Sequence, residues 1–152
     1  MAQEPEYDVV VVGSGAAGLS TAIRSHDLGL RVLVIEAWSK LGGATAYSAG
    51  QIWAGKNHLM VREGLQDTPE ETRAYVTAIN DDPTKLDDQQ LWQWVDQAPR
   101  VLEDLEKRQA LKLEIVPGLC DYYFPHAAGS KKEGRYLAVS LSLVSVLQTE
   151  AT

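Results

Sequence analysis

The chain has one cysteine, no long apolar run and no cluster of basic residues. A single cysteine, Cys120, excludes an intramolecular disulfide and a multi-cysteine zinc site, and it fits a reducing compartment. No apolar run approaches the length of a membrane span. The N-terminus is acidic where a secretory signal needs basic residues. These absences predict a cytoplasmic protein without a membrane span.

Positive charge is also scarce. The net charge is -7 over 152 residues, and the longest basic block is Lys131-Lys132. Such a balance does not favour binding to nucleic acid or to an anionic membrane. The three histidines lack the spacing of metal ligands. We therefore predict no nucleic-acid partner and no metal site.

A glycine motif follows the first apolar segment. Residues 7–12 are mostly β-branched, which predicts a strand buried in a parallel sheet. The motif's first glycine permits a tight turn, the second lets the backbone approach a pyrophosphate, and the third permits close packing of helix on strand. A helix over 16–28 would then present its N-terminal amides and positive dipole to the anion. The predicted ligand-binding residues here are Gly13, Ser14, Gly15, Ala16, Ala17 and Gly18.

An acidic residue ends the next apolar run. Val32–Ile35 predicts a second strand, and Glu36 follows it, 18 residues after Gly18. A carboxylate at this place accepts hydrogen bonds from the adenosine ribose and repels a 2′-phosphate, so NADP is disfavoured. Ala37, next in the chain, is included in the predicted site. The choice between NAD and FAD stays open at this point.

A double glycine comes six residues after Glu36. Gly42-Gly43 is followed by small residues over 44–50, where the backbone can run close to a planar ligand. Simple NAD-binding domains usually continue directly into another helix here. The segment therefore favours FAD over NAD.

With these motifs, residues 9–55 resemble the fumarate reductase and 3-ketosteroid dehydrogenase family of FAD-dependent oxidoreductases. The resemblance implies an α/β fold: a Rossmann-like FAD-binding domain with a parallel sheet, incomplete here, plus a helical segment. It also implies that the double glycine and the residues after it run along the FAD pyrophosphate and isoalloxazine ring. The implied FAD contacts are Gly42, Gly43, Ala44, Thr45, Ser48, Ala49 and Gly50.

The middle of the chain has helical patterns. A helix of about ten residues is predicted to begin near Thr68. Thr68 is its N-cap, Pro69 takes the first helical position, and Glu71 closes a capping box. Apolar residues over 91–98 mark one face of another helix. Pro99 is expected to interrupt that face and to start a further helix.

An aromatic loop carries the second functional signal. Residues 113–117 predict a short strand, and the Asp-Tyr pair in the loop after it, 118–125, resembles a segment of ketosteroid dehydrogenases. In those enzymes, the resemblance implies, a tyrosine reaches the active site opposite the flavin. The implied catalytic residue is Tyr122, with Tyr123 as the alternative. A tyrosine hydroxyl has a usual pKa of about 10, so the site must lower that pKa or use the hydroxyl to polarise a partner.

The patterns divide the chain into four parts of one partial FAD-binding domain. These are a βαβ core over 1–55, a helical segment over 68–110, a strand and aromatic loop over 111–137, and a divergent tail over 138–152. Residues 134–137 match a last short family element, after which the resemblance ends. Family members are several times longer, so the chain resembles their N-terminal portion.

By resemblance, the function is that of a FAD-dependent oxidoreductase acting on CH–CH groups. Such enzymes dehydrogenate 3-ketosteroids or reduce activated double bonds, so a small molecule, a steroid among the candidates, is the expected substrate. The electron acceptor is left open. The alternative is a non-catalytic FAD-binding fragment, or a subunit that needs a partner chain or oligomer for completion. Whether the chain is itself an enzyme is also left open.

Overall fold

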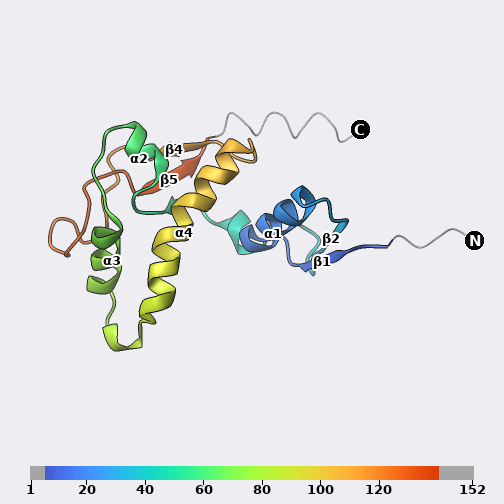
Figure 1. The fold of residues 1–152 in the computed structure, drawn as a ribbon, viewed down its shortest axis with the longest axis horizontal. Helices are drawn as coiled ribbons and strands as arrows, with labels where there is room; N and C mark the ends of the chain where they lie inside the picture. The colour runs from blue at the N-terminus through green and yellow to red at the C-terminus, as the bar shows by residue number, and fades with distance from the viewer. Residues whose placement is uncertain (1–5, 141–152) are drawn as a thin grey trace, which may run out of the picture. The chain divides into compact units, whose positions relative to one another are not determined.

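The computed structural model describes residues 6–140, in two compact units that divide between Gly50 and Gln51 (Figure 1). The first unit contains β1 (Val9–Val12), α1 (Ala16–Asp27), β2 (Val32–Ile35) and the short 3-10 helix η1 (Gly43–Tyr47). The second contains β3 (Ile52–Trp53), α2 (His58–Arg62), α3 (Pro69–Ala78), the 3-10 turn η2 (Pro83–Lys85), α4 (Asp88–Lys107), β4 (Leu113–Ile115) and β5 (Tyr136–Val139). None of the helices in residues 6–140 has the length and apolar character needed to cross a bilayer.

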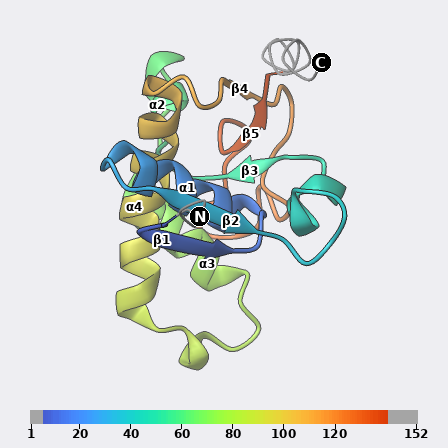
Figure 2. The same cartoon turned by 90° about the vertical axis from the view of Figure 1, so that its right-hand side faces the viewer.

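The first unit is a βαβ motif. Strands β1 and β2 pair in parallel, with Val9 opposite Val32 and Val12 opposite Ile35, and α1 connects them. Figure 2 shows α1 lying against this two-stranded sheet. The predicted strands, crossover helix and parallel pairing are confirmed, because short apolar β-branched runs and a helical spacing of small residues are local signals.

The second unit is built on an antiparallel sheet that the sequence did not predict. Its strand order is β3-β5-β4, with Ile52 and Ile115 both opposite Leu137. Strand β3 has two residues and shows no periodicity, and β5 crosses position 137, where the family resemblance ends. The divergent tail predicted over 138–152 lies outside the described residues from 141 onward. The core of this unit consists of Ala54, Leu59, Leu102, Leu113 and Leu137.

Helix α3 begins where the sequence predicted. The Thr68 hydroxyl accepts the Glu71 N–H at 3.1 Å, and Pro69 is the first helical residue. The capping box also predicts that the Glu71 carboxylate accepts the Thr68 N–H. This prediction is wrong, because the carboxylate pairs with Lys131 Nζ at 2.8 Å. The Thr68 N–H donates to Asp67 Oδ1 at 2.9 Å, so an aspartate replaces the expected glutamate.

Helix α4 runs through Pro99 without interruption, so the prediction of a break there is wrong. Proline inside a helix costs about 3 kcal/mol, because it removes one backbone hydrogen bond and crowds the preceding turn. Leu91, Val95 and Leu102 are buried along one stripe of α4 that spans the proline. Burying each such side chain contributes about 1.5–3 kcal/mol, so their combined burial exceeds the cost.

We predict that Leu137→Ala destabilises the second unit by about 2–5 kcal/mol, because it leaves a cavity in the core. Leu137 is 0% exposed, whereas Val139 on the same strand is 39% exposed. The matched control Val139→Ala should therefore cost about 0.5 kcal/mol or less. Urea unfolding followed by tryptophan fluorescence measures both, and equal costs would contradict the assignment of Leu137 to the core.

Candidate FAD site and aromatic loop

The start of α1 offers backbone donors to an anion. The first N–H groups of a helix have no partners within the helix, and the helix dipole is positive at this end. The Ala16 N–H donates to Thr45 Oγ1 at 3.2 Å. The amides of Ala17 and Gly18 follow in the same turn. This end of α1 therefore fits a pyrophosphate held by backbone groups alone.

Two glycines of the motif serve different purposes. A Cβ built on Gly18 would lie 2.0 Å from the Gly13 carbonyl oxygen, so the fold itself requires glycine there. A Cβ built on Gly15 would meet nothing closer than 3.9 Å, the distance to Gly42 O and Thr45 Oγ1. The protein atoms thus leave room for a Cβ at Gly15. A glycine that packing does not require, beside a helix N-terminus, fits the close approach of a ligand.

Glu36 is fixed by the loop that precedes α1. Its Oε2 accepts the Ser14 N–H at 2.9 Å and the Ser14 hydroxyl at 2.5 Å, and its Oε1 accepts the Trp38 N–H at 3.1 Å. Ser14 is buried, and its Oγ also accepts the Gly42 N–H at 2.8 Å. The Ser14 hydroxyl therefore positions Glu36 and Gly42. The sequence pattern indicated a loop hydroxyl at Ser14 but not this link.

These hydrogen bonds keep Glu36 ionised. The Ser14 hydroxyl is the largest cause, followed by the Ser14 and Trp38 N–H groups, and together they lower the pKa of Glu36 to about 2. An ionised carboxylate accepts hydrogen bonds from sugar hydroxyls and repels a phosphate. The charge and position of Glu36 therefore fit the adenosine ribose of FAD.

The predicted FAD segment after Glu36 forms a tight turn into η1. Gly42 has φ 112°, and a Cβ on it would lie 2.6 Å from Ala46 Cβ, so both conformation and packing require glycine. The Ser48 hydroxyl donates to Thr45 O at 2.8 Å and accepts the Gly50 N–H at 3.1 Å. All residues from Gly43 to Ala49 are exposed.

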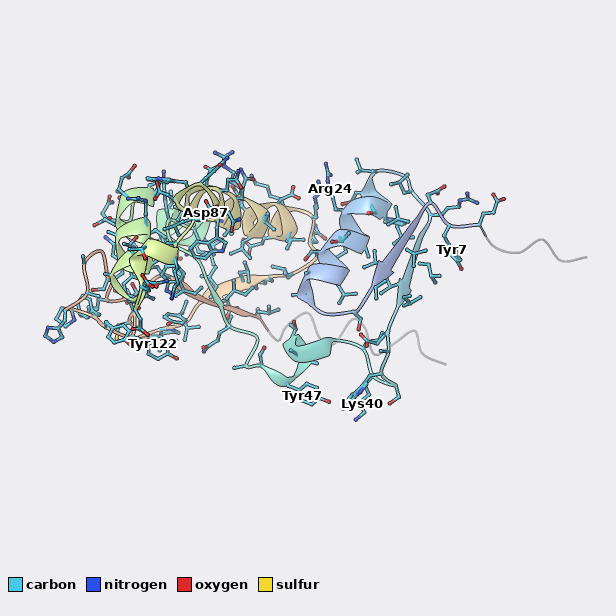
Figure 3. The ribbon with its side chains drawn as sticks, turned by 90° about the horizontal axis from the view of Figure 1, so that it is seen from below. Tyr7, Arg24, Lys40, Tyr47, Asp87 and Tyr122 are labelled. Atoms are coloured by element: carbon cyan, nitrogen blue, oxygen red, sulfur yellow. The ribbon has the colours of Figure 1, made fainter. Side chains whose placement is uncertain are left out.

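A pocket of about 540 Å³ opens between this segment and Glu36. Trp38 and Tyr47 meet edge to face beside it, with ring centroids 6.4 Å apart. Figure 3 shows Lys40 and Tyr47 projecting from this part of the chain. The pocket is lined by Glu36, Trp38, Lys40, Leu41, Gly43, Ala44, Ala46 and Tyr47. A carboxylate beside an apolar aromatic wall suits a nucleoside.

In the second unit, Tyr122 stands on the surface. It is 86% exposed and is labelled in Figure 3. Its ring meets the ring of Tyr136 edge to face, with centroids 6.2 Å apart. Tyr123, the alternative, is also exposed. Burial is the main cause that raises the pKa of Tyr136, and the neighbouring Tyr122 adds to it. The tyrosine pair is a feature that the sequence did not reveal.

A buried group of charges adjoins this loop, and no sequence pattern predicted it. Arg135 contacts both Asp67 and Asp121 at hydrogen-bonding distance. Asp121 and Arg135 lie in the two family elements that drew attention to this region, but Asp67 is 68 residues from Arg135. No short-range sequence pattern predicts a contact between residues so far apart in the chain. Residues 6–140 contain no group of three or more His, Cys, Asp or Glu residues that could hold a metal ion.

The βαβ fold, the helix N-terminus and Glu36 define a dinucleotide-binding domain. The family model described as "FAD binding domain" matches residues 8–143, so the chain belongs to this family of FAD-binding domains. The prediction of FAD as the cofactor is confirmed.

The chain is similar to several 3-oxosteroid 1-dehydrogenases. The chain is 42% identical to the 3-oxosteroid 1-dehydrogenase of Mycolicibacterium smegmatis, over 86% of this chain and 22% of that protein. It is 36% identical to the NADH:fumarate oxidoreductase of Klebsiella pneumoniae, over 72% of this chain and 12% of that protein. The predicted family resemblance is thereby confirmed. The chain spans about a fifth or less of the length of these curated relatives.

A solved structure also matches. The 3-ketosteroid Δ1-dehydrogenase of Sterolibacterium denitrificans, in complex with 1,4-androstadiene-3,17-dione, has a TM-score of 0.81 and 33% identity to this chain. The match covers 94% of this chain and 25% of that one. The α/β fold of a partial FAD-binding domain is confirmed.

We predict that Ser14→Ala raises the pKa of Glu36 from about 2 toward its usual 4.5, because the mutation removes the main hydrogen bond to the carboxylate. A lowered pKa stabilises the fold above pH 4.5, and this stabilisation is lost as pH falls from 4.5 toward 2. The stability difference between wild type and variant should therefore be constant above about pH 5 and shrink below it.

A ¹³C NMR titration of the Glu36 carboxyl group, combined with unfolding curves from pH 2.5 to 7, measures both effects. Thr21→Ala is the control, since its hydroxyl bonds to Ala17 O within α1 and not to Glu36. An unchanged Glu36 titration in Ser14→Ala would contradict the link.

Proposed function

We propose that this chain is the FAD-binding portion of an oxidoreductase that acts on a CH–CH bond beside a ketone, with 3-ketosteroids as the substrate class. The observation that carries the proposal is Gly15 at the N-terminus of α1, where packing does not require glycine, with Glu36 at the end of the next strand. The oxosteroid names of the relatives support the substrate class.

The first unit would supply the cofactor site. The glycine loop, with Ala16 and Ala17, would hold the pyrophosphate, and Glu36 with Ala37 would hold the adenosine ribose. The backbone from Gly42 to Gly50 would follow the rest of the cofactor. FAD, when bound, supplies a group that accepts or donates a hydride.

Tyr122 would handle the proton in this reaction, with Tyr123 as the alternative. Its exposure leaves the hydroxyl accessible to a substrate. A phenol with a pKa near 10 is a weak base, so its role requires a lowered pKa or a polarised partner. The electron acceptor and the particular steroid stay open, and the cytoplasm is the proposed location.

The second candidate is a FAD-binding unit without turnover of its own. One observation favours it: the β1–β2 sheet has two strands, and Val12, Val10 and Ile35 on it are exposed. Apolar strands of a parallel sheet are normally covered on both faces. We therefore propose that further polypeptide, from the same chain or a partner, completes the domain.

We predict that Gly15→Val abolishes FAD binding while the fold persists, because a Cβ at residue 15 keeps ordinary van der Waals distances to the protein and the side chain would occupy the proposed pyrophosphate position. Glu36→Ala should weaken FAD binding roughly ten- to hundredfold through loss of charge-assisted hydrogen bonds. Titration of FAD fluorescence measures affinity, and circular dichroism checks folding.

Glu63→Ala is the control for these variants, since Glu63 is an exposed carboxylate in the second unit. Wild-type affinity in both site variants would overturn the site. A wild-type protein that stays colourless with added FAD would overturn the proposed function as a whole.

We predict that Tyr122→Phe lowers turnover of a 3-ketosteroid by about 10²–10⁴-fold, because the hydroxyl that handles the proton is removed. Flavin content should not change. The assay uses the FAD-loaded protein, with any polypeptide that completes it, and an artificial electron acceptor. Tyr123→Phe is the matched control, and a larger loss in that variant would transfer the role to Tyr123. Absence of turnover in the wild type would favour the second candidate.

A further inference from the structure

The second unit contains a buried ion cluster, formed by Arg135, Asp67 and Asp121. Their charged side chains are each 1% exposed. Arg135 binds Asp67 through two bonds, from Nε at 2.8 Å and from Nη2 at 2.7 Å. Its Nη1 donates to Asp121 Oδ2 at 2.8 Å. The planar guanidinium is therefore fixed between two carboxylates that lie far apart in the sequence.

Asp121 is held at its side chain and at its backbone. Oδ1 accepts the Trp53 indole N–H at 2.7 Å, and Oδ2 also accepts the Lys131 N–H at 2.7 Å. The Asp121 N–H donates to Lys131 O, and the Asp121 carbonyl accepts the Phe124 N–H, both at 2.9 Å. Few conformations of residue 121 satisfy all these bonds, so the backbone that leads into Tyr122 is fixed.

Arg135 is held in a similar way. Its guanidinium lies over the rings of Trp53 and Tyr75, at 5.3 and 5.6 Å from their centroids. The Arg135 carbonyl accepts the Ala54 N–H at 2.9 Å, beside the pairing of β5 with β3. The next residue, Tyr136, begins β5. Each partner of the Arg135–Asp121 ion pair thus directly precedes one tyrosine of the Tyr122–Tyr136 pair.

Stability alone does not account for this arrangement. Removing charges from water costs several kcal/mol per ion, and replacing a buried ion pair by apolar residues is often neutral or stabilising. Apolar residues do not fix the orientation of a side chain. The Arg135 guanidinium, by contrast, donates to two carboxylates and is held in one orientation. An exposed side chain such as Tyr122 otherwise changes rotamer in picoseconds to nanoseconds.

We infer that Asp121 and Arg135 are positioning residues, whose buried ion pair holds Tyr122 and Tyr136 in contact as a fixed pair on the protein surface. The inference rests on the proposed function, because that function gives Tyr122 its role. An oriented hydroxyl reacts faster than a mobile one, since the entropy of orientation is lost before the reaction. Tyr136 is then a second tyrosine of the site, positioned by its place after Arg135.

The experiment follows both rings by ¹⁹F NMR in the full chain labelled with 3-fluorotyrosine. Tyr122→Phe and Tyr136→Phe assign the two signals. In wild type, we expect Tyr122→Phe to shift the Tyr136 signal, because the rings are in contact. In Asp121→Asn, this coupling should be lost, and the Tyr122 signal should narrow and move toward that of a freely exposed tyrosine.

The matched control is Asp67→Asn. It removes a charge from the same guanidinium at equal burial, but Asp67 does not adjoin either tyrosine. It should lower stability while the ring coupling persists. Arg135→Lys keeps the charge but loses the Nη1 donor to Asp121 Oδ2, so it should weaken the coupling and serves if Asp121→Asn does not fold.

Equal loss of coupling in Asp67→Asn and in the positioning variants would reduce the cluster to a structural role and overturn the inference. Coupling that survives in all of them would overturn it as well. FAD titration of the same samples separates the two proposals. Failure of wild type to bind FAD would overturn the proposed function, whereas the tyrosine coupling is measured without FAD.

Discussion

The carboxylate of Glu36 is the constraint on which the nucleotide-binding unit depends. Through Ser14 it connects the glycine loop to the end of β2, and the same Ser14 hydroxyl connects that loop to Gly42. Three segments that would form a cofactor site are therefore fixed by one group of hydrogen bonds. Because these bonds also keep Glu36 ionised, they set the geometry and the charge of the site together.

Apolar burial contributes little to this unit. Within residues 6–50, the buried residues are Val11 and Ser14, and α1 has no buried residue. In the second unit, by contrast, an apolar core lies beside the Arg135 ion cluster. In both units, nevertheless, a carboxylate accepts hydrogen bonds from loops that are distant in the sequence. Hydrogen bonds of this kind add little net stability but select one arrangement of the loops.

What the sequence revealed was mostly local. Residues 7–36 signal their strands and helix through short-range spacing, and Thr68 with Pro69 signals the start of α3, so these elements were predictable. The proposed ribose-binding role of Glu36 also rests on spacing within one βαβ unit. Gly15 and Gly18 look equivalent in the motif, and only the surrounding atoms show that packing requires one of them and not the other.

The features that escaped prediction depend on distant partners. Pro99 signals a helix end, and burial of residues on both sides of it overrides that signal. Strand β3 is defined by its pairing with β5, more than 80 residues later in the chain. Asp67 looks like a polar residue before a helix, yet it is buried against Arg135. In each case the deciding energy comes from tertiary contacts, which residue spacing does not contain.

The first unit has a small apolar core, so its stability depends strongly on what binds to it. A ligand that binds the folded form alone stabilises it by mass action, and so does polypeptide that covers an exposed sheet. Hydrogen bonds within the protein fix the loops around Glu36, and a site fixed in this way loses little freedom when a ligand binds. Polypeptide that covers Val10 and Val12 would contribute burial to the domain, while hydrogen bonds within residues 6–50 set the geometry of the proposed ribose and pyrophosphate site.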